Sequence, residues 1–342
     1  MRVDVLDMPR RTIVAAALVA VSGAAASAAG LNASAPSVSP HRDDSMPLSI
    51  DDRLQSLLRH PAFAGHARLL LPWDDRPYDE AMPLRQIGSL LPYHSHVEPR
   101  IVVDALNRMI EDVRCGQAVF HRFYTPDQRR ADPLKENTGL FFFRGKPGAP
   151  FALIAPGGGF AYVGSVHEGF PHAQEISRQG YNAFVLRYRP GRGEQAATED
   201  MAAAISWLFR HAAELDIDTS GYSVWGSSAG ARMAANIGSH GPGGFGGDAL
   251  PKPAVVVMAY TGHDRFTPHE PPTFVVVGDQ DGIAPPATME RRVAALRAQG
   301  TRVEVRRYKG LGHGFGIGTG TSAEGWVAEA IRFWSEINQR GR

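Results

Sequence analysis

The chain has 342 residues, of which 43% are hydrophobic and 21% charged, so it is large enough for one globular domain with additions. Its 36 basic residues nearly balance its 35 acidic residues, which excludes the strong electrostatic footprint of a nucleic-acid-binding or anionic-membrane-binding protein. This balance suits a small neutral substrate better.

The first 28 residues have the order of an export signal. Arg10 and Arg11 precede an apolar run at 13–21, and Ala-Ser-Ala follows at 26–28. The run is shorter than the roughly 20 residues of a membrane-spanning helix, so we expect no stable membrane insertion. We predict cleavage after Ala28 and a periplasmic or secreted protein. The paired arginines resemble a twin-arginine signal, with an ordinary Sec signal or an uncleaved anchor as the alternatives.

Residues 29–50 are rich in Ser, Pro and Ala, which is typical of a linker. Residues 51–137 are expected to form an N-terminal extension that packs on the main domain. Apolar residues recur there at helical spacing after Pro99, which predicts one helix. The single cysteine, Cys115, falls in this pattern and is expected to be a buried structural thiol.

His94, His96 and Glu98 have a spacing that metal ligands can adopt, but no further ligand pattern accompanies them. We therefore predict neither a metal site nor a cofactor. The histidine and aromatic side chains of this extension are expected to pack against the main domain or to form the rim of its pocket.

From residue 138 onward, apolar runs alternate with helical patterns. Strands are predicted at 140–143, 151–155, 183–188, 222–225, 254–258, 273–277 and 303–308. Helices are predicted at 171–179, 199–215, 229–237, 287–299 and 323–338. This alternation indicates an α/β fold with a mostly parallel sheet covered by helices on both faces. Functional loops should gather at the carboxyl ends of the strands.

Gly226-Ser227-Ser228-Ala229-Gly230 joins a predicted strand to a predicted helix. This is the context of the G-x-S-x-G turn, in which small residues allow a strained bend that exposes a serine hydroxyl. The pattern alone is weak in a chain with 37 glycines, but its position between strand and helix strengthens it. Ser228 is therefore the candidate nucleophile.

The loop Pro156-Gly157-Gly158-Gly159-Phe160 directly follows a predicted strand. Glycines let a backbone turn its N–H groups toward a developing oxyanion. We predict an oxyanion hole formed by the amides of Gly158 or Gly159 together with that of Ala229. A plain tight turn is the alternative.

These motifs resemble those of the α/β-hydrolase superfamily, in particular its serine esterase and acetylesterase branch with a glycine-rich oxyanion loop. The resemblance covers residues 138–339 and implies the α/β-hydrolase fold, with residues 138–342 as the catalytic domain. One departure is that Pro156 stands where this branch often carries the histidine of His-Gly-Gly-Gly. The hydrogen bonds of that histidine to the loop are therefore missing from the motif.

The resemblance implies an acid after the predicted strand 273–277 and a histidine after the strand 303–308. Asp281 matches the acid and is favoured over Asp279, which is expected to form the turn or to cap a helix. His313 lies between glycines in a loop before the last predicted helix. The order of nucleophile, acid and histidine is that of the superfamily.

The sequence thus predicts a serine carboxylic ester hydrolase with the triad Ser228, Asp281 and His313. Phe160 and Tyr162 follow the glycine loop and are expected to narrow the pocket toward short acyl groups. Small-molecule esters are the expected substrates. Acetylated carbohydrate esters are included among them because the protein is predicted to be exported. A serine peptidase or amidase, or a non-catalytic binding protein on the same scaffold, is the alternative.

Overall fold

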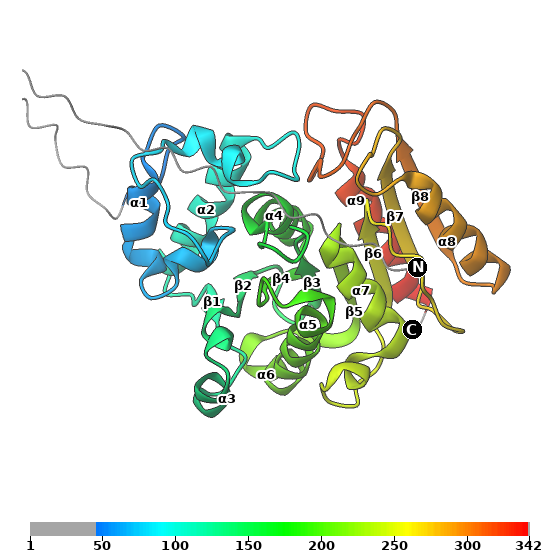
Figure 1. Cartoon of the computed structure of the whole chain (residues 1–342). Coiled ribbons are helices and arrows are strands. Elements are labelled where there is room, and N and C mark those ends of the chain that lie inside the picture. The colour runs from blue at the N-terminus through cyan, green and yellow to red at the C-terminus, as the bar shows by residue number, and fades with distance from the viewer. Residues whose placement is uncertain (1–45, 341–342) are drawn as a thin grey trace, which may run out of the picture. The chain divides into compact units, whose positions relative to one another are not determined.

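Within residues 46–340, which the computed structural model describes, one sheet has the strand order β1-β2-β4-β3-β5-β6-β7-β8 (Figure 1). The predicted export signal and most of the predicted linker lie outside these residues. The strands are β1 (Phe120–His121), β2 (Gly139–Phe143), β3 (Pro150–Ala155), β4 (Asn182–Arg187), β5 (Asp218–Ser227), β6 (Val255–Ala259), β7 (Thr273–Gly278) and β8 (Val303–Tyr308).

Helices surround this sheet. The α-helices are α1 (Leu54–Arg59), α2 (Pro99–Arg114), α3 (Pro126–Ala131), α4 (Phe170–Arg178), α5 (Gly193–Arg210), α6 (Ala212–Leu215), α7 (Ala229–His240), α8 (Pro286–Ala298) and α9 (Trp326–Arg340). Short 3-10 helices span Pro61–Phe63, Ala67–Leu70, Leu84–Leu90, Pro133–Asn137 and Pro242–Phe245, and a π-helical turn spans Ser165–Gly169. None of the helices among residues 46–340 combines the length and apolar character needed to cross a bilayer.

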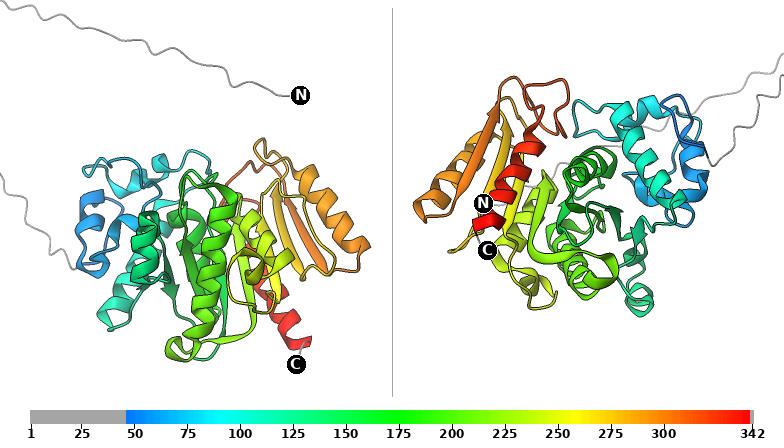
Figure 2. Two further views of the ribbon diagram at one scale, coloured as in Figure 1. Left: turned by 60° about the horizontal axis from the view of Figure 1, so that its bottom comes forward. Right: turned by 180° about the vertical axis from the view of Figure 1, so that it is seen from behind.

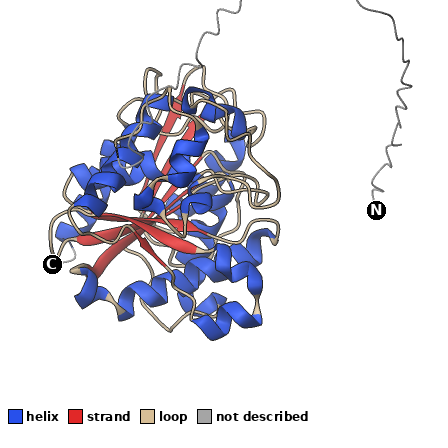
Figure 3. Ribbon diagram, turned by 90° about the vertical axis from the view of Figure 1, so that its left-hand side faces the viewer, coloured by secondary structure: helices blue, strands red, loops and turns tan. Residues whose placement is uncertain are grey.

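The sheet is mostly parallel, as the sequence predicts. Each of the strands from β3 to β8 is parallel to its neighbours within this group, while β2 is antiparallel to β4 and β1 is antiparallel to β2. Successive strand residues alternate between two buried clusters, so both faces are covered. Helices α4 and α9 contribute to one cluster and α5, α7 and α8 to the other, and Figures 2 and 3 show helices on both sides of the strands.

The predicted strands are confirmed, with ends that shift by a few residues. The exceptions are local. β1 was not predicted because a two-residue strand leaves no periodic signal, and it places the start of the sheet before residue 138. The predicted helix 199–215 begins earlier, at Gly193, and is interrupted at His211, whose ring contacts the carbonyl oxygen of Trp207 at 2.8 Å.

Residues 46–119, here called the N-terminal segment, share a core with the sheet. Leu106 and Met109 of α2 are fully buried in the same cluster as Phe141 and Phe170. The end of the predicted linker is already docked, because Leu48 is buried and its backbone pairs with the side chain of Asn107.

The prediction of a buried cysteine is wrong. Cys115 follows the last residue of α2 and is exposed. Ile110 is the last buried residue of the helix and Val113 is only partly buried, so the core does not extend to the C-cap position.

We expect Leu106→Ala to lower the free energy of unfolding by about 2–5 kcal/mol, because it empties a fully buried site in the shared core. The exposed neighbour Asp104→Ala should change it by less than about 0.5 kcal/mol. Urea unfolding followed by tryptophan fluorescence and circular dichroism checks this. Because the core is shared, both signals should move together; a separate transition for the N-terminal segment would contradict the shared core.

A second prediction concerns acid stability. His172 of α4 is buried with its ring centroid 5.4 Å from that of Trp326, and burial lowers its pKa to about 3. Below pH 6.5 the unfolded chain binds a proton at this site while the folded chain does not, so stability falls as the pH drops from about 6.5 toward 3.

His172→Phe should therefore reduce the stability lost between pH 7 and pH 5 by about 2 kcal/mol. His240→Phe, at an exposed position, is the matched control and should leave that loss unchanged. Urea midpoints measured across the pH range test this, and identical pH slopes for the wild type and His172→Phe would contradict it.

Candidate active site

Ser228 lies in a strained turn between β5 and α7. Its φ of 51° is in the left-handed region, which non-glycine residues rarely occupy. A Cβ on Gly226 would lie 2.2 Å from the carbonyl oxygen of Gly230, and one on Gly230 would lie 1.9 Å from that of Ala155. Only glycine fits at both positions, so strand and helix approach closely and the serine stands at the bend.

The side chains of Ser228, His313 and Asp281 meet in hydrogen-bonding order. The Nε2 atom of His313 is 2.8 Å from the Oγ of Ser228, and its Nδ1 atom is 2.8 Å from an oxygen of Asp281. Because a carboxylate only accepts hydrogen bonds, Nδ1 carries the proton and Nε2 is left as an acceptor for the serine hydroxyl. This is the arrangement in which an imidazole activates a hydroxyl.

The geometry separates the two candidate acids. Asp281 is 4% exposed, and its other oxygen accepts hydrogen bonds from the backbone amides of Ile283 and Ala284, which hold the carboxylate in place. Asp279 instead accepts a hydrogen bond from the amide of Gly310 at 2.7 Å. Asp279 therefore shapes the turn, as expected, and Asp281 contacts the histidine.

The glycine loop lies against the nucleophile. A Cβ on Gly157 would come within 2.9 Å of the Cβ of Ser228, and Gly158 and Gly159 have φ values of 131° and 62°. Ala229 is the first residue of α7, so its N–H has no carbonyl partner within the helix. The three amides predicted as oxyanion donors thus belong to segments that flank Ser228, and their role stays a prediction.

The two predicted pocket residues differ. Phe160 is half-buried, with its ring centroid 6.3 Å from that of Tyr188. Tyr162 has no exposed surface, and its hydroxyl pairs with the amide of Tyr93 and the ring of His94. The expectation that Tyr162 lines the pocket is therefore not met, because its ring is buried against Gly158.

Sequence reasoning missed a buried carboxylate beneath this loop. Glu168 lies on the π-helical turn and is fully buried. It accepts hydrogen bonds from the amide of Gly157 and the hydroxyl of Tyr260, each at 2.7 Å, and it faces the Nε2 of His94 at 3.1 Å. Burial alone would raise the pKa of Glu168, but the charge and hydrogen bond of His94 outweigh it and hold the pKa below its ordinary value.

The same network reaches the histidine loop. The ring of Tyr260 lies 5.2 Å from that of His313. Burial raises the pKa of Tyr260, and the nearby charge of Glu168 raises it further, so the hydroxyl stays protonated and donates a hydrogen bond. Ser95 binds this loop twice, through its amide to Gly314 and through its hydroxyl to the carbonyl of His313.

One sequence signal could have revealed Glu168. It is the only Asp, Glu, Lys or Arg between Pro156 and Gln174, a stretch otherwise apolar or neutral, and a charge in such a stretch calls for a buried partner. His94 carried no comparable signal, because its partners lie more than 60 residues away.

The suggested ligands near His94 do not form a metal site. His94 faces Glu168 and Tyr162, whereas His96 is exposed. Among residues 46–340, no group of three or more histidine, cysteine or acidic side chains is arranged to hold a metal ion.

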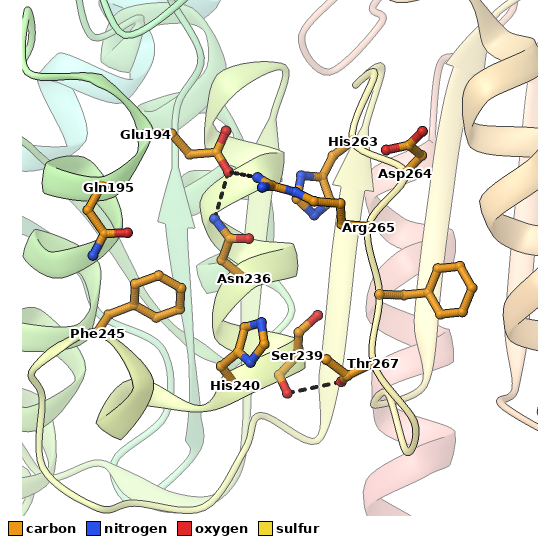
Figure 4. A pocket seen from close by; sticks show the side chains of 11 residues that line it. Glu194, Gln195, Asn236, Ser239, His240, Phe245, His263, Asp264, Arg265 and Thr267 are labelled. Carbon is orange, nitrogen blue, oxygen red and sulfur yellow. Dashed lines mark hydrogen bonds and ion pairs between the residues drawn. The ribbon is translucent and has the colours of Figure 1, made fainter.

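A polar cavity of about 800 Å³ lies beside α7 (Figure 4). Its lining comes from the start of α5, the later turns of α7 and the connection between β6 and β7, and includes Glu194, Asn236, His263 and Arg265. Glu194 binds both Asn236 and Arg265 across it. Ser228 does not line this cavity.

Two family models match separate parts of the chain. The BD-FAE family model matches residues 145–243, and the prolyl oligopeptidase family model matches residues 256–340. No curated protein shows significant sequence similarity to the chain.

Several solved structures resemble the chain. An α/β hydrolase enzyme, MGS-M1, from a Medee basin deep-sea metagenome library is 23% identical, with a TM-score of 0.52 over 59% of this chain and 93% of that chain. An acetyl ester-xyloside bifunctional hydrolase from Caldicellulosiruptor lactoaceticus is 19% identical, with a TM-score of 0.55 over 64% of this chain and 96% of that chain. A propionate-bound thermophilic esterase, Est2, from Thermogutta terrifontis is 20% identical, with a TM-score of 0.50 over 58% and 89%. The fold is that of the α/β hydrolases.

The turn itself yields a stability prediction. Gly230→Ala should lower the free energy of unfolding by about 1–3 kcal/mol or more, because the new methyl group would collide with the backbone of β3, which cannot rotate away. Gly262→Ala is the control: a Cβ there meets nothing within 4 Å, so the change should stay below about 1 kcal/mol. Chemical denaturation measures both, and equal stabilities would contradict the close contact between β3 and α7.

Proposed function

We propose that this serine hydrolase of the α/β-hydrolase fold is a carboxylic ester hydrolase that works through Ser228, His313 and Asp281. The observation that carries the proposal is the hydrogen-bonded series from the Asp281 carboxylate through the His313 ring to the Ser228 hydroxyl, with 2.8 Å at each step. Unaided serine is a poor nucleophile at neutral pH, and this series supplies the base that it needs.

The first half of the reaction follows from these contacts. As the Ser228 oxygen attacks the ester carbonyl, the Nε2 of His313 accepts the hydroxyl proton. Asp281 keeps Nδ1–H oriented and stabilises the imidazolium that forms. The imidazolium then gives its proton to the leaving alcohol, and an acyl-enzyme remains on Ser228.

The tetrahedral intermediate carries a negative charge on the former carbonyl oxygen. The amide of Ala229, with that of Gly158 or Gly159, is proposed to donate hydrogen bonds to it. Each such donor typically contributes about 3–4 kcal/mol to lowering the barrier. Water then attacks the acyl-enzyme with His313 again acting as the base, which releases the acid and restores the serine.

The proposed substrates are short-chain esters, including acetylated carbohydrates. The connection between β6 and β7, residues 260–272, contains no helix, so no helical lid covers the site from this connection. A site without such a lid suits soluble substrates better than a lipid interface. The name of the Caldicellulosiruptor lactoaceticus neighbour describes action on an acetyl ester and a xyloside, and the predicted export signal supports an extracytoplasmic carbohydrate substrate.

A serine peptidase or amidase is the second candidate. The match of residues 256–340 to the prolyl oligopeptidase family favours it, and that stretch carries both Asp281 and His313. The same three side chains can cleave an amide, so the substrate distinguishes the two candidates rather than the triad.

We expect Ser228→Ala to lower the turnover of p-nitrophenyl acetate by as much as about 10⁶-fold, since the nucleophile is removed. Ser220→Ala, at an exposed position at the start of β5, is the matched control and should retain full activity. Retained turnover in Ser228→Ala would eliminate the assigned nucleophile.

A substrate panel with the mature protein then separates the candidates. Acetyl to octanoyl p-nitrophenyl esters and acetylated xylan should be cleaved with a preference for the short acyl groups, and a peptide anilide should be cleaved far more slowly. Faster cleavage of the anilide would favour the peptidase.

A further inference from the structure

We propose that Glu168 and His94 are a positioning pair that holds the oxyanion loop in its active geometry, and that the N-terminal segment thereby completes the catalytic site. This proposal rests on the proposed function, because it assigns a role to residues around the same nucleophile. Neither residue is proposed to touch the substrate.

The need for such a pair arises from the loop itself. Pro156 has no side-chain hydrogen bond to offer and no backbone N–H, so the residue that opens the loop cannot fasten it as a donor. The carboxylate of Glu168 fastens the loop instead, because it accepts a hydrogen bond from the N–H of Gly157 at 2.7 Å. Since Gly157 packs against the Cβ of Ser228, this hydrogen bond fixes the loop next to the nucleophile.

The carboxylate also connects the loop to the catalytic histidine. One oxygen of Glu168 binds Gly157 and faces His94, while the other accepts the hydroxyl of Tyr260. The Tyr260 hydroxyl in turn lies 3.3 Å from the amide of Gly316, three residues beyond His313. A single buried charge therefore bridges the two loops that must act together.

His94 is the partner of this carboxylate and comes from a distant part of the sequence. Its side chain is 2% exposed and that of Glu168 is 0% exposed, so water cannot replace the imidazole as a partner. A buried carboxylate that loses its partner either takes up a proton or moves toward solvent. Both changes weaken or displace the hydrogen bond to Gly157, and the loop moves with it.

The space around His94 is tightly filled. A Cβ on Gly164 would lie 2.8 Å from the ring of His94, and a Cβ on Gly314 would lie 2.8 Å from its Cα. The next residue, Ser95, binds the carbonyl of His313 at 2.7 Å. Residues 94 and 95 thus pack between the support of the oxyanion loop and the histidine loop, where a shift in one affects both.

The test compares His94→Gln, Glu168→Gln and the double variant with the wild-type chain. With p-nitrophenyl acetate, each single variant should lose about 10- to 100-fold in kcat while KM stays within about threefold. The reason is that the displaced amides stabilise the transition state, whereas substrate binding does not depend on them. The inhibition constant of an alkyl trifluoromethyl ketone, which forms a tetrahedral adduct with serine, should rise by a similar factor.

The double variant is the diagnostic arm. His94→Gln leaves the Glu168 carboxylate facing a neutral amide in place of the imidazole, whereas His94→Gln with Glu168→Gln leaves two neutral amides. The double variant should therefore recover part of the kcat that His94→Gln loses, which is a coupling that independent sites do not show.

Asp74→Asn is the matched control, because Asp74 pairs with the fully buried Arg187 and so also joins the N-terminal segment to the sheet. This ion pair involves neither the oxyanion loop nor the histidine loop, so Asp74→Asn should lower the melting temperature while leaving kcat and the inhibition constant within twofold. Asn107→Ala, which removes the contacts to Leu48, serves the same purpose if Asp74→Asn does not fold.

Two results would overturn the positioning role. One is wild-type kcat in both His94→Gln and Glu168→Gln. The other is an equal loss of kcat in the controls at equal loss of melting temperature, which would make the effect one of general stability. Loss of turnover in Ser228→Ala alongside either result would leave the proposed function standing, whereas persistent turnover in Ser228→Ala would remove the proposed function itself.

Discussion

The strained turn at Ser228 is the constraint on which the rest of the site depends. A non-glycine residue with a φ of 51° persists only where its surroundings hold it, and here Gly226 and Gly230 allow β5, β3 and α7 to pack around it without side chains between them. The parallel strands then bring their loops to the same edge of the sheet. Loops that are far apart in sequence therefore lie close to the hydroxyl of Ser228.

Interactions behind the triad connect these loops to one another. Glu168, Tyr260 and His94 come from the π-helical turn, the end of β6 and the N-terminal segment, and their contacts converge on one buried carboxylate. Polar groups in such a place are either fully paired or destabilising. The site is therefore better described as loops fastened to a common buried charge than as three side chains on a rigid sheet.

The sequence was informative where the signal is local. The strands from β2 to β8 follow from apolar runs, and Ser228, Asp281 and His313 follow from short motifs in the right order. Glu168 and His94 were missed because their roles exist only through contacts across the fold. Cys115 and Tyr162 were misjudged for the same reason: helical spacing does not tell where a core ends, and proximity to a loop in sequence does not tell on which side of it a ring packs.

The hydrogen bonds of Ser95 to the histidine loop have a consequence for how the chain matures. Ser95 and His313 are 218 positions apart, so the contact between them closes a very long loop. During synthesis the earlier partner emerges long before the later one and must wait for it. The triad therefore cannot assemble until the loop after β8 has been made, and a chain truncated before β8 would lack both His313 and the carbonyl group that Ser95 binds.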